Sequence, residues 1–158
     1  MPQRTFELTT FAPVPAEFAF RFLSDLNNHR YLHPFFVRAE QVGVGSDASG
    51  RVYRDFMVTE RPNFAFVRYT IHFPTRMFLG NDGQFTSEVK AALGTSLVNV
   101  MRCAVEGQGT RITESVTVAA PAWTLAYVRR EAFTAHSQTF RRLPEALQSR
   151  FKAEAPLG

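Results

Sequence analysis

The most regular hydrophobic pattern in the chain spans Ala122–Phe151. At 100° per residue, one side of this segment forms an apolar stripe. The stripe consists of Leu125, Ala132, Phe133, Phe140, Leu143 and Leu147. The spacing predicts a helix roughly 45 Å long at 1.5 Å per residue, which needs an equally long partner. Arg129 and His136 are the two non-apolar residues inside the same stripe.

Pro144 interrupts this helical pattern. A proline inside a helix removes one backbone donor, and its ring collides with the preceding turn. We therefore expect the helix to kink or end near Leu143, with the last turns through Arg150 forming a separate segment.

The N-terminal part of the chain predicts one strand followed by short helices. Thr5–Phe11 alternates apolar and polar residues, which indicates a half-buried strand. Pro15 suits the first turn of a helix, and helical spacing continues to about Leu26. His29–Leu32 predicts a further helical turn, which Pro34 ends.

From Phe36 onward the hydrophobic period changes to two, which predicts a run of strands. The predicted strands are Val37–Val44, Arg51–Glu60, Phe64–Phe73, Phe85–Leu93, Ser96–Glu106 and Arg111–Ala119. The third of these can continue past Pro74 to Leu79 as an edge or bulged strand. The sequence from Gly80 to Gly83 is the clearest hairpin turn. Such short connections predict antiparallel neighbours.

This order of elements predicts an α+β fold. One strand, two short helices, about six further strands and a long helix form a curved antiparallel sheet of about seven strands wrapped around a C-terminal helix. Because strand twist accumulates across a sheet, a sheet of this size curls and leaves a hollow beneath the helix. A chain of 158 residues suits a single domain, and we assign residues 1–158 to one.

Composition adds one feature to this picture, a surplus of phenylalanine. The chain has 16 Phe against 4 Tyr and 1 Trp. Large aromatic side chains are compatible with a lined cavity and also with an ordinary filled core. The sequence does not decide between the two.

Charge and cysteine content exclude several classes of protein. The formal net charge of +4 comes from arginines scattered along the chain, so we expect no nucleic-acid partner, which would need a basic stripe with interleaved aromatics. Cys103 is the only cysteine, which rules out an internal disulfide and suits a reducing compartment. With no secretory leader and no long apolar run, we expect a cytoplasmic protein without an integral membrane segment. A homodimer stays open.

Two polar residues of the long helix are candidate site residues. His136 shares a face with the apolar stripe, so a neutral imidazole there can orient a ligand carbonyl or act as acid and base. It can equally be a core histidine bonded to a strand. Arg129, on the same face, can pair with a ligand carboxylate or phenolate, or extend out of the pocket mouth with only its stem buried.

Two strand residues are further candidates. Glu114 alternates in phase with Ile112 and Val116, so it is a buried carboxylate if that face is inward. Arg129 or an inward strand arginine would then be its partner; if the opposite face is inward, Thr113, Ser115 and Thr117 line the interior. Tyr69 offers a pocket hydroxyl, although a core tyrosine with a bonded hydroxyl is the plainer interpretation.

We expect neither a metal nor a cofactor. His29 and His33 have a spacing that can hold a metal, but Pro34 breaks the helix there and no third ligand sits at a suitable distance. Cys103 lacks the charged surroundings of a reactive thiol, so a small buried residue is the default. No phosphate-binding loop or nucleophile motif is present.

Several stretches of the chain resemble the START/Bet v 1-like (SRPBCC) helix-grip superfamily, in particular its bacterial polyketide cyclase/dehydrase-like branch. They are Pro13–Phe18 leading into Phe22–Leu26, Leu32–Val37, Gly109–Glu114, and Ala135–His136 followed by Arg142–Leu147. The resemblance implies a sheet and C-terminal helix that enclose a hydrophobic ligand pocket, with His33 at its rim. Members of the superfamily bind lipids, hormones and polyketides, or act as cyclases and aromatases.

Residues and resemblance together predict that the protein binds a hydrophobic small molecule between sheet and helix. The ligand would be polyketide-like, aromatic or lipid. The expected lining consists of His33, Tyr69, Ile71, Phe73, Phe85, Glu114, Leu125, Arg129, Ala132, Phe133, His136 and Phe140. One alternative is a cyclase, aromatase or dehydratase that uses His136, Arg129 or Tyr69 as its catalytic residues. A second is a protein-interaction or regulatory module.

Overall fold

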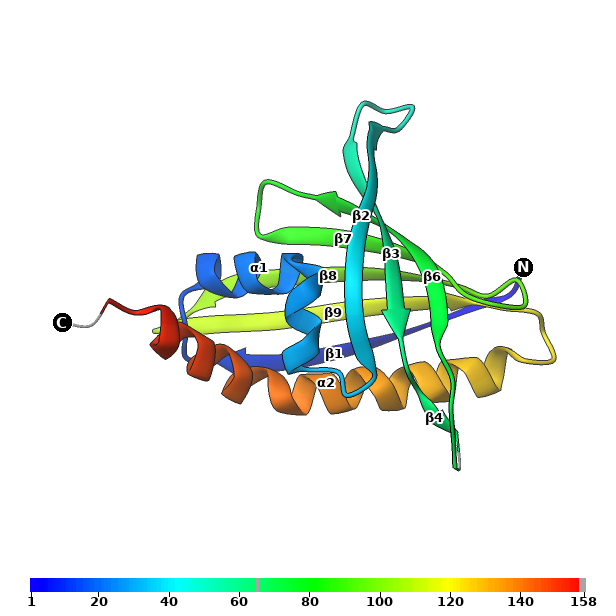
Figure 1. Ribbon diagram of the computed structural model, residues 1–158. Coiled ribbons are helices and arrows are strands. Elements are labelled where there is room, and N and C mark those ends of the chain that lie inside the picture. Colours follow the sequence, from blue (N-terminus) through cyan, green and yellow to red (C-terminus); the bar gives the residue numbers. More distant parts are fainter. Residues whose placement is uncertain (65, 157–158) are drawn as a thin grey trace.

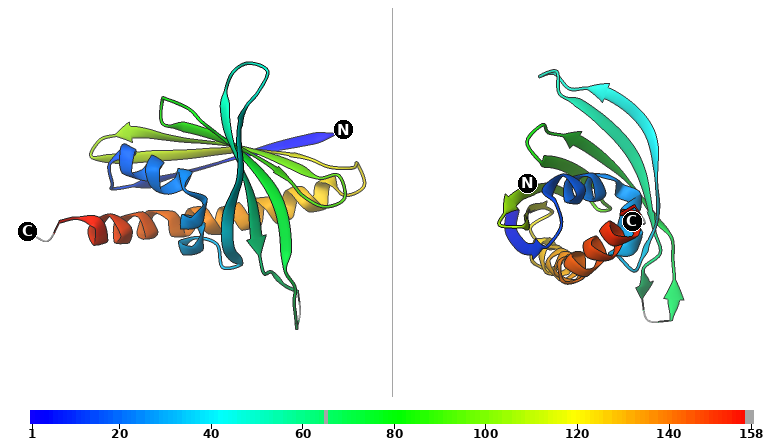
Figure 2. Two further views of the ribbon diagram at one scale, coloured as in Figure 1. Left: turned by 45° about the horizontal axis from the view of Figure 1, so that its top comes forward. Right: turned by 90° about the vertical axis from the view of Figure 1, so that its left-hand side faces the viewer.

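The computed structural model describes residues 1–64 and 66–156. A seven-stranded antiparallel sheet in the order β1-β9-β8-β7-β6-β3-β2 curls around a long helix (Figures 1 and 2). The strands of this sheet are β1 (Gln3–Ala12), β2 (Phe36–Ser46), β3 (Val52–Glu60), β6 (Ile71–Leu79), β7 (Gln84–Lys90), β8 (Ser96–Glu106) and β9 (Gly109–Ala119). This architecture confirms the predicted helix-grip fold.

The helices lie on the concave face of the sheet, as the end-on view in Figure 2 shows. They are α1 (Ala16–Ser24), the 3-10 helix η1 (Leu26–Tyr31) and α2 (Leu125–Glu154). Helix α1 packs on β8 and β9, while α2 packs mainly along β1. The apolar stripe is buried at Leu125 and along the second half of α2, but Phe133 is 42% exposed. Contact between α2 and the sheet is therefore closest near the edge formed by β1.

Helix α2 begins later than its hydrophobic pattern predicts. Residues 122–124 form a turn in which the backbone N–H groups of Thr124 and Leu125 both donate to the carbonyl of Pro121. The Thr124 hydroxyl donates to the same carbonyl at 3.1 Å. This turn connects β9 to α2 and moves the helix start from Ala122 to Leu125.

Of the two alternatives expected at Pro144, a kink or an end of the helix, the end is wrong, because α2 continues through Pro144 to Glu154. Leu143 and Leu147, on either side of the proline, are both fully buried in the main core. Burial of two such side chains stabilises the helix by several kcal/mol, on the order of the cost of one internal proline. Packing therefore outweighs the local break.

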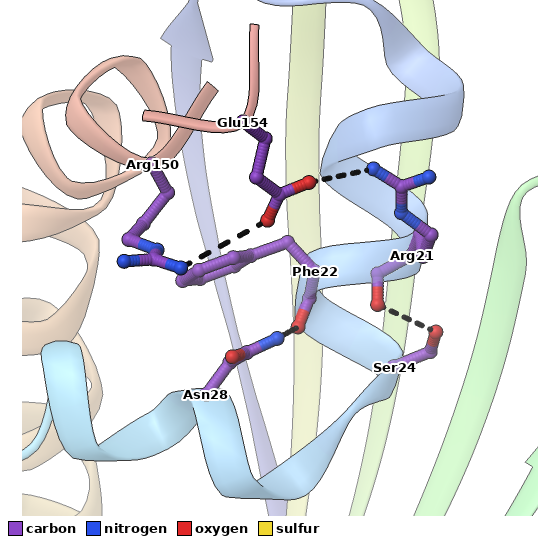
Figure 3. Close-up of polar contacts among 6 residues, drawn as sticks. All are labelled: Arg21, Phe22, Ser24, Asn28, Arg150 and Glu154. Atoms are coloured by element: carbon purple, nitrogen blue, oxygen red, sulfur yellow. Dashed lines mark hydrogen bonds and ion pairs between the residues drawn. The ribbon is translucent and has the colours of Figure 1, made fainter. Parts of the chain in front are cut away.

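Polar and aromatic contacts tie the C-terminal end of α2 to α1. Figure 3 shows the guanidinium groups of Arg21 and Arg150 pointing toward the carboxylate of Glu154, at 3.0 and 4.0 Å. Phe151 packs against Phe18 of α1 with ring centroids 5.0 Å apart. The segment beyond Pro144 is thus part of the packed structure and not a separate unit.

The predicted strand Phe64–Phe73 is wrong in its first part, whereas its continuation past Pro74 to Leu79 is confirmed by β6. The structure places a small two-stranded hairpin there, β4 (Asn63–Phe64) and β5 (Val67–Arg68), and the next long strand is β6. Pro74 lies inside β6, opposite Met57 of β3. Pairing of β6 with β7 begins only at Thr75, so the missing N–H of Pro74 costs no ladder hydrogen bond on that side.

Most of the core lies between α1, the second half of α2 and the sheet. It includes Phe22, Leu23, Met77 and Ile112. A second, smaller cluster joins Phe6, Val116 and Val118 to the start of α2 at Leu125. Among the residues that the structure describes, no helix is long and apolar enough to cross a membrane.

Candidate functional site

Strand β9 turns its Ile112–Glu114–Val116 face toward the helices. Ile112, Val116 and Val118 are 0% exposed and Glu114 is 6% exposed, whereas Thr113, Ser115 and Thr117 are only partly buried. This settles which of the two faces is inward. A carboxylate buried to this degree needs a hydrogen-bonding or charged partner.

The partner of Glu114 is His136 of α2. His136 Nδ1 lies 2.8 Å from Glu114 Oε2, which joins the helix to β9 across the interior. The expectation that Arg129 or a strand arginine would pair with Glu114 is wrong. Arg129 instead places its guanidinium carbon 5.9 Å from the ring centroid of Phe6.

This pairing sets the orientation of the imidazole. A carboxylate accepts hydrogen bonds, so Nδ1 of His136 is the donor, and Nε2 is the ring nitrogen left for another partner. Burial alone would favour the neutral ring, but the Glu114 carboxylate outweighs it and raises the pKa of His136 above 6.5. The side chain of His136 is 24% exposed against 7% for Glu114, so the imidazole lies at the accessible end of the pair.

An aromatic ring packs against the imidazole on the β1 side. The ring of Phe6 meets that of His136 edge to face, with centroids 5.9 Å apart. Phe133 also packs edge to face on Phe6, with centroids 5.3 Å apart. The polar pair therefore sits in an apolar frame, in which its hydrogen bonds are stronger than in water.

Two further histidines and a second carboxylate lie close enough to His136 to interact with it electrostatically. Burial lowers the pKa of His29 to about 4, and the positive charge on His136 adds to that effect. Burial likewise lowers the pKa of His33, and His136 contributes there too. Burial raises the pKa of Glu60, an effect that the charge on His136 partly offsets. Residues from η1, β3, β9 and α2 thus converge on one region.

The tautomer of His33 also follows from its contacts. The backbone N–H of Phe35 donates to His33 Nδ1 at 3.3 Å, so the neutral ring carries its proton on Nε2. His29 packs against Phe36 with centroids 6.1 Å apart. At neutral pH both rings are uncharged, and the cluster combines neutral donors and acceptors with the Glu114–His136 pair.

The structure brings some predicted lining residues together and leaves others apart. Phe85, Leu125 and Phe140 are buried, and the partly buried residues are His33, Ile71, Phe73, Arg129 and Ala132. Phe133 packs on Phe6 from a half-exposed position. Tyr69 is 45% exposed and lies between β5 and β6, where its backbone N–H donates to the carbonyl of Pro62. Its hydroxyl is not part of the cluster around His136.

Sequence reasoning missed His29 and Glu60 as members of the site. Glu60 is the last residue of β3 and lies two residues after the buried Val58, so both are on the same strand face. This alternation was the signal in the sequence that could have found Glu60. It also missed Ser87 and Asn99, which are directly opposite each other on β7 and β8. That pairing depends on strand register, which single-strand patterns do not contain.

Two open surface grooves lie away from this cluster. One, of about 420 Å³, is lined by Tyr31, Arg142, Glu145, Ala146, Ser149 and Arg150. The other, of about 550 Å³, lies between the start of α1, the turn before β7 and the end of β8. Neither groove is lined by Glu114 or His136.

In the part of the chain that the structure describes, no three His, Cys, Asp or Glu residues are grouped so as to hold a metal ion. Cys103 is buried, and burial raises the pKa of its thiol to about 12. The thiol is therefore protonated at neutral pH and unreactive as a nucleophile.

The sequence matches no protein-family model and no curated protein sequence. Its structure, however, resembles many solved structures. The ZhuI aromatase/cyclase from Streptomyces sp. R1128 superposes with a TM-score of 0.70 at 14% identity, covering 99% of both chains. Ara h 8.0201 superposes with a TM-score of 0.67 at 16% identity, covering 94% of this chain and 99% of the other.

A third similar structure is SA2116 from Staphylococcus aureus, described as a protein of unknown function. It gives a TM-score of 0.72 at 6% identity and covers 96% of this chain and 97% of the other. At such identities the likeness concerns the fold. The chain has the Bet v 1-like helix-grip fold, as the sequence resemblance implied.

Proposed function

We propose that the protein binds a hydrophobic small molecule on the concave face of the sheet, with Nε2 of His136 bonded to an oxygen of the ligand. The observation that carries this proposal is the bond between His136 Nδ1 and Glu114 Oε2 at 2.8 Å. Glu114 holds the ring in one orientation and leaves Nε2 as the polar group at its accessible end. A few placed polar groups in an apolar lining are typical of small-molecule sites.

The apolar part of the ligand would contact the partly buried side chains of the same face. Ile71 and Phe73 are partly buried on the face of β6 that also carries the buried Met77, and Ala132 of α2 is partly buried against the cluster of Phe6 and Val116. Covering such side chains stabilises a complex by about 25 cal/mol per Å² of apolar area removed from water. Aromatic, polyketide-like and lipid molecules all have apolar area of this kind.

A ligand screen by thermal shift and native mass spectrometry tests the proposal. The panel contains naphthols, flavonoids, steroids and long-chain fatty acids. We expect at least one class to raise the melting temperature and to form a one-to-one complex. If no class stabilises the protein or forms a complex, the proposal fails.

Variants connect binding to the proposed anchor. His136→Ala should weaken the best ligand about tenfold, which corresponds to ~1.4 kcal/mol. His72→Ala is the matched control, because His72 lies on β6 and is exposed, with Nδ1 bonded to Thr59 at 3.0 Å. Equal loss of affinity in both variants would count against a specific role for His136.

A second candidate function is acid–base catalysis on a carbonyl substrate. It is favoured by the same pair, since a carboxylate on Nδ1 stabilises the imidazolium that forms when Nε2 takes a proton. The nearby rings of His29 and His33 are uncharged because burial lowers the pKa of each. They can therefore hydrogen-bond a substrate oxygen without adding positive charge to the site. Such a site would exchange the protons next to a ketone.

Hydrogen–deuterium exchange into 1-phenyl-1,3-butanedione in heavy water, followed by NMR, tests this second candidate. The enzyme hypothesis predicts exchange above the buffer rate, and loss of that excess in His136→Ala and Glu114→Gln. Exchange at the buffer rate, for a probe that binds, would leave a binding protein and exclude this chemistry.

A further inference from the structure

The inward face of the sheet carries polar side chains on strands β6 to β9. They are Thr75 of β6, Ser87 of β7, Asn99 of β8 and Glu114 of β9. Each shares its strand face with buried apolar residues: Met77, Phe85, Met101 and Ile112, respectively. These polar groups therefore point to the same side of the sheet as the core does.

The strand register places these residues in a continuous diagonal. Ser87 is directly opposite Asn99, and Asn99 is opposite Val116, two residues from Glu114. On the other side, Ser87 is opposite Met77, two residues from Thr75. Diagonal neighbours on adjacent strands are about 7–8 Å apart, so the diagonal is long enough for several polar groups of one molecule.

Hydrogen bonding along this diagonal is incomplete. Asn99 Nδ2 donates to Ser87 Oγ at 3.0 Å, which uses one end of the amide. Among the described residues, Asn99 Oδ1 and Thr75 Oγ1 are buried and have no hydrogen-bond partner. Thr75 is 4% exposed and Ser87 7% exposed. Buried polar atoms are normally paired, so unpaired ones indicate a partner that the protein itself does not supply.

Helix α2 packs less closely on this part of the face than on its β1 edge. Within the described chain, α2 packs along β1 and the adjoining part of β9, without comparable packing on β6, β7 or β8, whereas α1 packs on β8 and places Phe20 against Phe85 of β7. The side chains of Val89, Leu97 and Asn99, which lie on the inward face, remain partly exposed. A molecule bound at His136 would extend across β8 and β7 along these partly exposed side chains.

We propose that the ligand is a two-ended molecule, with one oxygen held by His136 and a far end whose polar groups, each a hydroxyl or an N–H, donate separately to Asn99 Oδ1 and to Thr75 Oγ1. The proposal rests on the proposed function and narrows it to elongated molecules with polar groups at both ends. A molecule with a single polar head would leave the acceptors of β8 and β6 unpaired, and the site would discriminate against it.

Two rigid phenols test the proposal by isothermal titration. The probes are 4,4′-dihydroxybiphenyl and 4-hydroxybiphenyl, which share one shape and differ by the second hydroxyl. The wild-type protein should bind the diphenol about tenfold more tightly. In Asn99→Ala or in Thr75→Val, whichever removes the acceptor that the second hydroxyl reaches, this preference should fall to about twofold or less, while affinity for the monophenol stays close to wild type.

Thr75→Val keeps the experiment interpretable if Asn99→Ala folds poorly, because valine and threonine have nearly the same shape. A wild-type protein that binds both phenols equally would overturn the proposal, as would a preference unchanged in both variants. In either case, the proposed function would stand if His136→Ala still weakened binding of the monophenol. Ordered water would then be the partner of Asn99 Oδ1 and Thr75 Oγ1. If neither phenol binds and the wider panel also fails, both proposals are wrong.

Discussion

His136 of α2 and Glu114 of β9 form a hydrogen-bonded pair, 2.8 Å apart, across the interior of the sheet. The pair couples the position of the helix to the charge of one imidazole. It also makes the energetics of the fold sensitive to pH, because the pKa of His136 is raised above 6.5.

The first prediction concerns stability above neutral pH. A raised folded-state pKa means that the contribution of His136 is fully present below about pH 6.5 and is lost as pH rises through the folded value. The free energy of unfolding should therefore decline on the alkaline side of pH 6.5. Glu114→Gln should abolish most of this decline. Urea unfolding between pH 6 and 9 measures it, and an identical slope in wild type and variant would contradict the assignment.

The second prediction concerns acid and involves His29, whose pKa burial lowers to about 4. The pH dependence has the opposite sign to that of His136. The contribution of His29 to the free energy of unfolding is fully present above about pH 6.5 and is lost as the pH falls toward 4. Charging this ring in the folded protein costs up to about 3 kcal/mol at low pH, less where solvent reaches it. His29→Gln should flatten the acid limb of the stability curve.

Together the two histidines predict maximal stability near pH 6.5, at the meeting point of the two limbs. Histidine signals followed by NMR during a pH titration give the two pKa values directly. A His29 signal that titrates near 6.5 would remove the basis of the acid prediction.

The third prediction compares two buried threonines with similar exposure. Thr75 Oγ1 has no partner among the described residues, whereas Thr59 Oγ1 lies 3.0 Å from His72 Nδ1. Thr75→Val should raise the free energy of unfolding by about 1 kcal/mol, because it removes an unpaired buried hydroxyl. Thr59→Val should lower it by a similar amount. Chemical denaturation measures both, and a destabilising Thr75→Val would show that ordered water satisfies the hydroxyl.

The fourth prediction concerns Pro144 inside α2. Proline cannot donate the backbone hydrogen bond to the carbonyl of residue Phe140, and its ring crowds that turn. Pro144→Ala should therefore stabilise the protein, by about 1–3 kcal/mol. Thermal unfolding followed by circular dichroism measures the change. A lower melting temperature would mean that neighbouring helix packing depends on the proline ring.

The fold could be predicted from sequence because its elements depend on patterns within single segments. Strand alternation located Ser96–Glu106 with the bounds of β8. Local rules failed where packing opposes them: Leu143 and Leu147 hold the helix together across Pro144. They also failed at Phe64–Phe73, where a small hairpin interrupts what composition alone describes as one strand.

The site could be predicted only in part, because it depends on relations between segments. The helical phase of His136 placed it on the inward face of the helix, whereas the strand phase of Glu114 left open which face of β9 is inward, and the burial of Glu114 decides this. Their pairing could not be predicted, since it depends on where α2 crosses β9. The positions of His29 and Asn99 depend likewise on how η1 meets β2 and on the register between β7 and β8.

The central claim is that Nε2 of His136 holds a ligand while Nδ1 stays bound to Glu114. Nitrogen-15 NMR of the histidine rings during titration with the best ligand of the panel tests it most directly. We predict a shift at Nε2 of His136 that saturates with binding, little change at Nδ1, and no change at His72. Saturable binding that leaves both nitrogens of His136 unperturbed would contradict the account.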